Sequence, residues 1–401
     1  MISGHLQIKN DRYYMVLNLK DSNQKWKPKW ISTGLNIKGN KKRADILLRE
    51  TISKYEAIED KKQVEIEDVL FSSFMITWLE RIKSSVEETT FSAYRRIVQK
   101  SIAPYFEALG VTLAELKPKH IQGYYDYLLI EKKSSAATVR RHHANIRKAL
   151  QQAVKSDVIM TNPADKVEKP KVKPYIAKFY NDEGLNELFE KVKDTRLELP
   201  IIITAFYGLR RSEVLGLKWN SIDFKNKTIS VCHTVGEAED DNGKKYIVQK
   251  DRTKNKSSYR TLPLIPQIEE ALLQKKVREE EFRSVCRRSY CEDFSEYVLV
   301  DELGYLLKPE YLSRAFPSLL EKHNLRRIRF HDLRHSCASL LLKNGVNMKA
   351  IQEWLGHSHF STTANFYAHL DVDSKMESAN AIGNVLSIGR STQKKEIARV
   401  S

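Results

Sequence analysis

One short segment of the chain places a histidine and an arginine where both can act on the same group. In RIRFHDLRHSCASLLLKNGV, His331 and Arg334 are three residues apart at the start of an expected helix, so both side chains can point to one site. A guanidinium stays protonated and can bind two oxygens at once. Chemistry at an anionic group, such as a phosphate, would use this pair well.

Two other segments carry residues that suit the same chemistry. In TAFYGLRRSEVLGLKWNSIDF a Gly-Leu turn precedes Arg210, and Glu213 follows three residues later, where it could hold the guanidinium in position. In IQEWLGHSHFSTTANFYAH, His357 follows a turn glycine and Tyr367 comes ten residues later, near the end of an expected helix. A tyrosine hydroxyl among fixed cations could attack a phosphodiester.

Taken together, these segments resemble the active-site pattern of the tyrosine recombinase (phage integrase) family. The family's Arg, Lys, His-x-x-Arg, His and Tyr elements are matched in order by Arg210, Lys254, His331 with Arg334, His357 and Tyr367. The layout is most similar to conjugative-transposon integrases. The resemblance implies a site-specific DNA recombinase of a mobile element, which integrates and excises DNA through a 3′-phosphotyrosine intermediate and needs no metal or other cofactor.

Charge explains why that reaction needs these residue types. Attack on a phosphodiester builds negative charge on the non-bridging oxygens, and Arg210, Arg334 and His357 could stabilise that charge. The ordinary pKa of a phenol is about 10, so Tyr367 needs neighbouring cations and a proton acceptor, for which His331 is the natural candidate.

The leaving 5′ oxygen needs a proton, which in the resembled family comes from a lysine on a β-hairpin. Lys254 in DRTKNKSSYRTLPL matches that position, and Lys256, two residues later, remains an alternative. The chain contains no G-x-x-x-x-G-K-[ST] loop, in agreement with a reaction that uses no nucleotide.

Two hydrophobic patterns divide the chain. Residues 5 to 35 alternate apolar and polar positions in short runs, which predicts a three-stranded sheet followed by a helix to about Lys62. From Ile66 the spacing is helical and predicts four helices. We expect a mainly α protein with a mixed α+β catalytic domain. Its predicted parts are an arm-type DNA-binding domain (1–62), a helical core-binding domain (66–162), a proline-rich linker (163–174), a catalytic domain (175–390) and a flexible tail (391–401).

Within the expected catalytic domain, helices are predicted near Asp182 to Val192, up to Tyr207, and from about Arg211 to Leu217. Strands are predicted at TISVCHTV, KKYIVQK, YRTLPL and EYVLV, and helices again from Gln267 onward.

The composition favours a polyanionic partner. The 401 residues contain 68 Lys and Arg against 51 Asp and Glu, a formal net charge of +17. We therefore expect binding to double-stranded DNA attachment sites. No long apolar stretch occurs, so we expect no membrane contact. The absence of a C-x-x-C pair fits reduced thiols, and we expect the protein in the bacterial cytoplasm, at the nucleoid. The residues proposed to contact DNA are Lys41, Lys42, Arg43, Arg140, Arg141, Arg147, Lys148 and Lys256.

Assembly is expected only from the resemblance. It implies a homotetramer on synapsed DNA, in which a segment near residues 373–388 packs on a neighbouring protomer, and an excisionase as a further partner.

Three alternatives stay open. His331 and His335 have the spacing of a helical zinc site, but that reading places Arg334 inside the site and leaves Tyr367 without a role. A non-catalytic DNA-binding regulator could keep the fold, although every motif position is filled. A type IB topoisomerase would use the same chemistry to relax one duplex.

Overall fold

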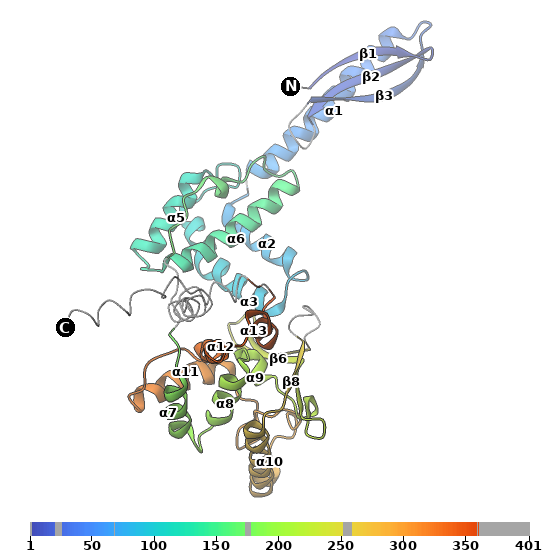
Figure 1. The fold of residues 1–401 in the computed structure, drawn as a ribbon. Helices are drawn as coiled ribbons and strands as arrows, with labels where there is room; N and C mark the ends of the chain where they lie inside the picture. The colour runs from blue at the N-terminus through green and yellow to red at the C-terminus, as the bar shows by residue number, and fades with distance from the viewer. Residues whose placement is uncertain are drawn as a thin grey trace, which may run out of the picture. The chain divides into compact units, whose positions relative to one another are not determined.

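The computed structural model describes residues 2–20, 26–67, 69–172, 178–251, 259–358 and 360. The chain divides into two compact units, Met1–Pro174 and Tyr175–Ser401, here called the N-terminal and C-terminal units (Figure 1). No helix in the described ranges is long and apolar enough to cross a membrane.

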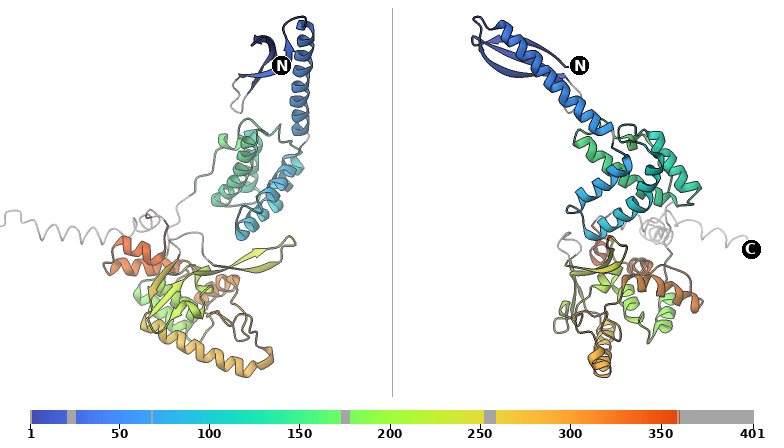
Figure 2. Two further views of the ribbon diagram at one scale, coloured as in Figure 1. Left: turned by 90° about the vertical axis from the view of Figure 1, so that its right-hand side faces the viewer. Right: turned by 180° about the vertical axis from the view of Figure 1, so that it is seen from behind.

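The N-terminal unit begins with the expected three-stranded sheet. Strands β1 (Ser3–Lys9), β2 (Arg12–Lys20) and β3 (Trp26–Asn36) are antiparallel in that order. Asn10 and Asp11 both have positive φ, as a two-residue hairpin turn requires. Helix α1 (Lys41–Glu67) lies along one face of the sheet (Figure 2), and Leu48 packs there against Met15 and Leu17.

The rest of the N-terminal unit is a helical bundle that confirms the four predicted helical runs. The second run is continuous: α3 passes through a π-helical turn, η1, into α4, which ends at Gly110 in the left-handed conformation. The helices are α2 (Phe71–Ile82), α3 (Glu88–Ile97), η1 (Val98–Ile102), α4 (Ala103–Leu109), α5 (Pro118–Ile130) and α6 (Ala136–Lys155).

The start of the predicted linker packs on this bundle instead of leaving it. Pro163–Lys166 form a 3₁₀ turn, η2, in which the N–H of Ala164 donates to the side-chain oxygen of Asn162. Arg147 pairs with Asp165 at 2.6 Å, and Ala164 is buried. Proline suits the first position of a helical turn, so Pro163 starts a turn within the segment predicted as an interdomain linker. The predicted domain limits remain expectations.

The C-terminal unit is mixed α and β. Strands β4, β5 and β8 form one antiparallel sheet, and β6 with β7 forms a hairpin. Helix α8 is buried on nearly every side and packs on α7, α9, α10 and α12. The elements are α7 (Asp182–Val192), α8 (Glu198–Tyr207), α9 (Arg211–Leu215), η3 (Trp219–Ser221), β4 (Ile222–Asp223), β5 (Thr228–Val231), β6 (His233–Glu239), β7 (Lys245–Asp251), β8 (Arg260–Pro263), α10 (Pro266–Cys286), η5 (Arg287–Ser289), α11 (Pro309–Lys322), α12 (Asp332–Lys343) and α13 (Met348–Leu355).

Two sequence predictions in this unit were wrong in detail. The run EYVLV forms no strand: Tyr297 and Val300 make only isolated bridges, to Lys218 and Leu306. Its apolar residues are buried in the core, but the backbone there is irregular. A short apolar run in the sequence is compatible with either conformation. Helix α9 stops at Leu215, earlier than expected, because Gly216 follows as its C-cap.

Candidate active site

The predicted site begins where α8 ends. Gly208 takes a left-handed conformation, with φ of +61°, and turns the chain so that Arg210 becomes the N-cap of α9. A Cβ on Gly208 would lie 2.3 Å from Leu355 Cδ2, so α8 and the end of α13 approach closely at this point. Only glycine meets both conditions at this position.

Glu213 holds Arg210, as the sequence suggested. Its carboxylate accepts from Arg210 Nη1 at 2.7 Å and from the Arg210 backbone N–H at 3.0 Å. Arg260, at the start of β8, also donates to it, with 3.1 Å between Nη2 and Oε2. Burial opposes the charge on Glu213, but Arg260 and Arg210 outweigh it and lower its pKa to about 2.

Arg260 was not predicted as a site residue. It is buried, with 8% of its surface exposed, and it shares the inward face of β8 with Leu262. The alternation in YRTLPL could have identified it, because side chains two apart on a strand share a face, and Arg260 shares its face with the apolar Leu262. An arginine on a buried face needs an acidic or polar partner.

Arg334 reaches the same place from α12. Its Nη1 donates to the carbonyl of Gly208 at 2.6 Å, while Nη2 of Arg210 donates to the carbonyl of Gly356 at 3.0 Å. Arg334 is thus held by a carbonyl two residues before Arg210, and Arg210 is held by the carbonyl of the residue before His357. Arg334 is 2% exposed, and its Nη2 has no hydrogen-bond partner among the described residues.

Burial and crowded positive charge together lower several pKa values in this site. Burial, followed by the charge of Arg210, lowers the pKa of Arg334 to about 9. Burial, with Arg334 and Arg210, lowers the pKa of His357 to about 3. His331 lies at the surface, and partial desolvation with the charge of Arg334 lowers its pKa as well. A phosphate between these groups would relieve the repulsion.

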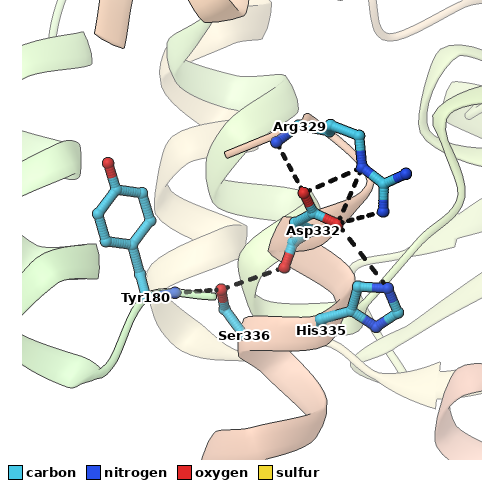
Figure 3. Close-up of polar contacts among 5 residues, drawn as sticks. All are labelled: Tyr180, Arg329, Asp332, His335 and Ser336. Carbon is cyan, nitrogen blue, oxygen red and sulfur yellow. Dashed lines mark hydrogen bonds and ion pairs between the residues drawn. The ribbon is translucent and has the colours of Figure 1, made fainter. Parts of the chain in front are cut away.

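Asp332 fixes the start of α12. Its buried carboxylate accepts three bonds from the Arg329 side chain and one from its backbone N–H, and it lies 3.9 Å from Nε2 of His335 (Figure 3). Ser336 donates to the Asp332 carbonyl and accepts from the Tyr180 N–H at 2.9 Å. The acidic residue of the proposed zinc motif therefore has a structural role, and no group of three potential ligands occurs in the described part of the chain.

The structure brings together Arg210, Glu213, His331, Arg334 and His357 through these contacts and mutual charge effects. Lys254, Lys256 and Tyr367 fall outside the described residues, as do the 373–388 segment and the tail. Their predicted roles remain proposals.

The predicted DNA-contact residues differ in their surroundings. Lys41, Lys42 and Arg43 are exposed at the start of α1, and the four of α6 are exposed as well. Within α6, however, Arg140 donates to the carbonyl of Pro170 and Arg147 pairs with Asp165.

Comparison with known proteins agrees with this geometry. The model of the phage integrase family matches residues 178–373, and that of the phage integrase N-terminal SAM-like domain matches residues 70–129. The chain belongs to the phage integrase family of tyrosine recombinases, enzymes that break and rejoin DNA.

Individual relatives cover most of the chain. A tyrosine recombinase XerC-like protein of Caldanaerobacter subterraneus subsp. tengcongensis is 28% identical over 344 residues, 82% of this chain and 86% of the relative. The ICEBs1 integrase of Bacillus subtilis is 23% identical over 79% of this chain and 84% of its own length.

Solved structures share the fold. The Tn1549 transposon integrase, in complex with circular intermediate DNA, superimposes with a TM-score of 0.62 at 20% identity, over 77% of this chain and 99% of that one. A lambda integrase dimer bound to a core site gives 0.55 at 16% identity, over 90% and 93%.

Proposed function

We propose that the chain is the integrase of a mobile genetic element, acting on double-stranded attachment sites for integration and excision. The observation that carries this proposal is the convergence of Arg210, Arg334 and His357 from three separate segments on one place where positive charge is crowded. Such a site suits a phosphodiester whose charge increases in the transition state. The integrases of ICEBs1 and Tn1549, among the similar proteins, support a mobile element.

In the proposed cleavage, the hydroxyl of Tyr367 attacks phosphorus and forms a 3′-phosphotyrosine link. Arg210 and Arg334 bind the non-bridging oxygens, and Glu213 keeps the first guanidinium oriented. His357, neutral in the free protein, donates an N–H to the same oxygens or takes up a proton as their charge grows. His331, whose pKa is also lowered, accepts the phenol proton.

Lys254 is proposed to protonate the 5′ oxygen as it leaves, with Lys256 as the alternative on the same segment. Since the phosphotyrosine bond conserves the energy of the broken bond, a 5′ hydroxyl of the partner duplex can reverse the step without a metal or nucleotide. We propose that four protomers hold the two duplexes, as in the structurally similar lambda integrase tetramer bound to a Holliday junction, and that an excisionase directs excision.

DNA contact by the N-terminal unit is proposed to use two surfaces. On the sheet, Trp30 is 47% exposed and Lys9 Nζ lies 5.9 Å from its ring centroid, so an exposed aromatic and a cation are adjacent. The basic residues of α1 and α6 would supply phosphate contacts, each of which makes binding more sensitive to salt. We place this activity in the cytoplasm, where the bacterial chromosome lies.

The recombination site is first found by sequencing the genomic DNA that stays attached to the protein after denaturation. The test is then covalent capture on a nicked suicide duplex that carries this site. We expect wild type to form an adduct whose DNA-linked peptide contains Tyr367. Tyr367→Phe should form no adduct and bind the same duplex within about threefold, since only the hydroxyl is lost. An adduct with Tyr367→Phe, or relaxation of plasmids that lack the site, would contradict the proposal.

A further inference from the structure

A buried histidine outside the catalytic set joins two strands where the chain leads to Lys254. His233 is the first residue of β6 and is 6% exposed. Its Nδ1 lies 2.6 Å from Oδ1 of Asp251, the last residue of β7, and its Nε2 lies 2.9 Å from the Tyr297 hydroxyl. Both ring nitrogens are therefore engaged.

The contacts run from the core outward. Because a carboxylate only accepts, Nδ1 of His233 donates to Asp251, and in the neutral ring Nε2 accepts from Tyr297. Tyr297 is fully buried, and the ammonium of Lys218 lies 4.9 Å from its ring centroid. By contrast, the side chain of Asp251 is 83% exposed. The exposed carboxylate of Asp251 is thus bonded to the buried ring of His233, and the hydroxyl of the buried Tyr297 fixes that ring.

The strand register places this contact in the sheets. His233 and Asp251 form the last pair of the β6–β7 ladder, and Val231 opposite Arg260 forms a pair of the β5–β8 ladder. Asp251 and Arg260 thus lie opposite two positions that are two residues apart on the β5–β6 stretch. The His233–Asp251 contact holds the last described residue before Lys254.

The same point is fixed relative to the arginine site. A Cβ on Gly216 would lie 2.6 Å from the carbonyl oxygen of His233, so the end of α9 and the start of β6 touch. Helix α9 begins directly after Arg210 and contains Glu213. Lys254 follows Asp251 by three residues, so its Cα lies within about 11 Å of the Asp251 Cα, whatever path the chain takes.

We propose that His233 is a positioning residue for leaving-group protonation: through Asp251 it fixes the point from which Lys254 reaches the 5′ oxygen. This inference rests on the proposed role of Lys254. In the step concerned, Tyr367 forms a bond to phosphorus, the bond from phosphorus to O5′ breaks with its electron pair moving to O5′, and Lys254 gives O5′ a proton. His233 should affect only that proton transfer.

Two substrates separate proton delivery from the rest of cleavage. One suicide duplex has the natural bridging 5′ oxygen, and the other has sulfur there. Because a thiol has a pKa of about 8.5, a thiolate leaves without a proton, and loss of the acid should matter little on the sulfur substrate. The measurement is the single-turnover rate of covalent adduct formation by the full chain.

The variants centre on the exposed end of the contact, where folding is least at risk. Asp251→Ala removes the carboxylate, and Asp251→Asn keeps an oxygen that accepts from His233. Asp240→Ala is the matched control, because Asp240 accepts from the N–H groups of Asn242 and Lys244 at the opposite end of the same hairpin. Lys254→Ala reports the effect of losing the acid itself.

We expect Asp251→Ala to slow cleavage of the oxygen substrate by about tenfold or more, with Asp251→Asn and Asp240→Ala within about threefold of wild type. On the sulfur substrate all three should lie within about twofold of wild type. Equal slowing of Asp251→Ala on both substrates, or none on either, would overturn the inference. If Lys254→Ala and Lys256→Ala were each slowed equally on both substrates, the acid assignment and the inference would both fail, whereas adduct formation by wild type would still support the recombinase.

Discussion

At the scale of single residues, the site depends on cations that the protein does not fully neutralise. Glu213 is the carboxylate that holds Arg210 and Arg260, while Arg334 is held by the carbonyl of Gly208. A carbonyl orients a guanidinium without cancelling its charge, so Arg334 keeps its attraction for a phosphate. Burial, followed by the charge of Arg210, lowers the pKa of Arg334.

Replacing Glu213 by glutamine should affect both stability and cleavage. The change keeps the volume but removes the negative charge that holds Arg210 and Arg260, and breaking a buried ion pair typically costs about 3–5 kcal/mol. We expect a lower free energy of unfolding in urea and at least about tenfold slower adduct formation. Glu190→Gln, at an exposed position of α7, is the control and should change stability by less than about 0.5 kcal/mol. Equal stabilities of the two variants would contradict the role of Glu213.

Acid should destabilise the site through its histidines. The pKa values of His335 and His357 are lowered to about 4 and about 3, so between pH 7 and pH 5 the unfolded chain binds protons that the folded chain does not. The free energy of unfolding should therefore fall as the pH is lowered over this range. The double variant His335→Asn, His357→Asn should show a shallower fall in the same urea titrations. An identical slope for variant and wild type would refute the assignment.

At the scale of elements, the close approach of α8 and α13 sets the distance between functional segments. Gly208→Ala would place a Cβ against Leu355 in a left-handed backbone, so we expect a loss of more than about 2 kcal/mol in stability and a large loss of cleavage. Gly243→Ala is the matched control, because Gly243 also has positive φ but no atom near its Cβ position. It should cost only about 1–2 kcal/mol and leave cleavage unchanged. Similar losses in both variants would show that backbone strain alone is responsible.

The sequence predicted the elements and site residues that have a local signature. Amphipathic spacing identified the helices of the bundle, and the residue types identified Arg210 and Arg334. Arg260 was missed because its partner Glu213 is 47 positions away, and the carbonyl contacts of Arg210 and Arg334 were missed because a backbone oxygen leaves no mark in a sequence. The EYVLV run was wrongly predicted as a strand because an apolar run alone does not show whether a strand lies beside it to pair with.

At the scale of the whole molecule, the division into two units predicts a cleavage pattern. Lys171 is exposed near the boundary and precedes Val172, whereas Lys169 and Lys173 precede prolines, which block trypsin. Brief trypsin treatment should therefore cut early after Lys171 and yield two fragments that remain folded. Mass spectrometry and circular dichroism would check this. Early cuts inside the helical bundle would contradict the proposed boundary.

The burial of Arg334 also affects how this protein could be engineered. Folding has to strip water from a guanidinium that has like charges around it and, in the described part of the chain, no partner for Nη2. An apolar side chain such as methionine would avoid that cost, and replacing buried charges in this way often stabilises a protein. A library screened only for heat resistance would therefore enrich Arg334→Met and similar variants. The most robust molecules recovered from it would be the ones that no longer cut DNA.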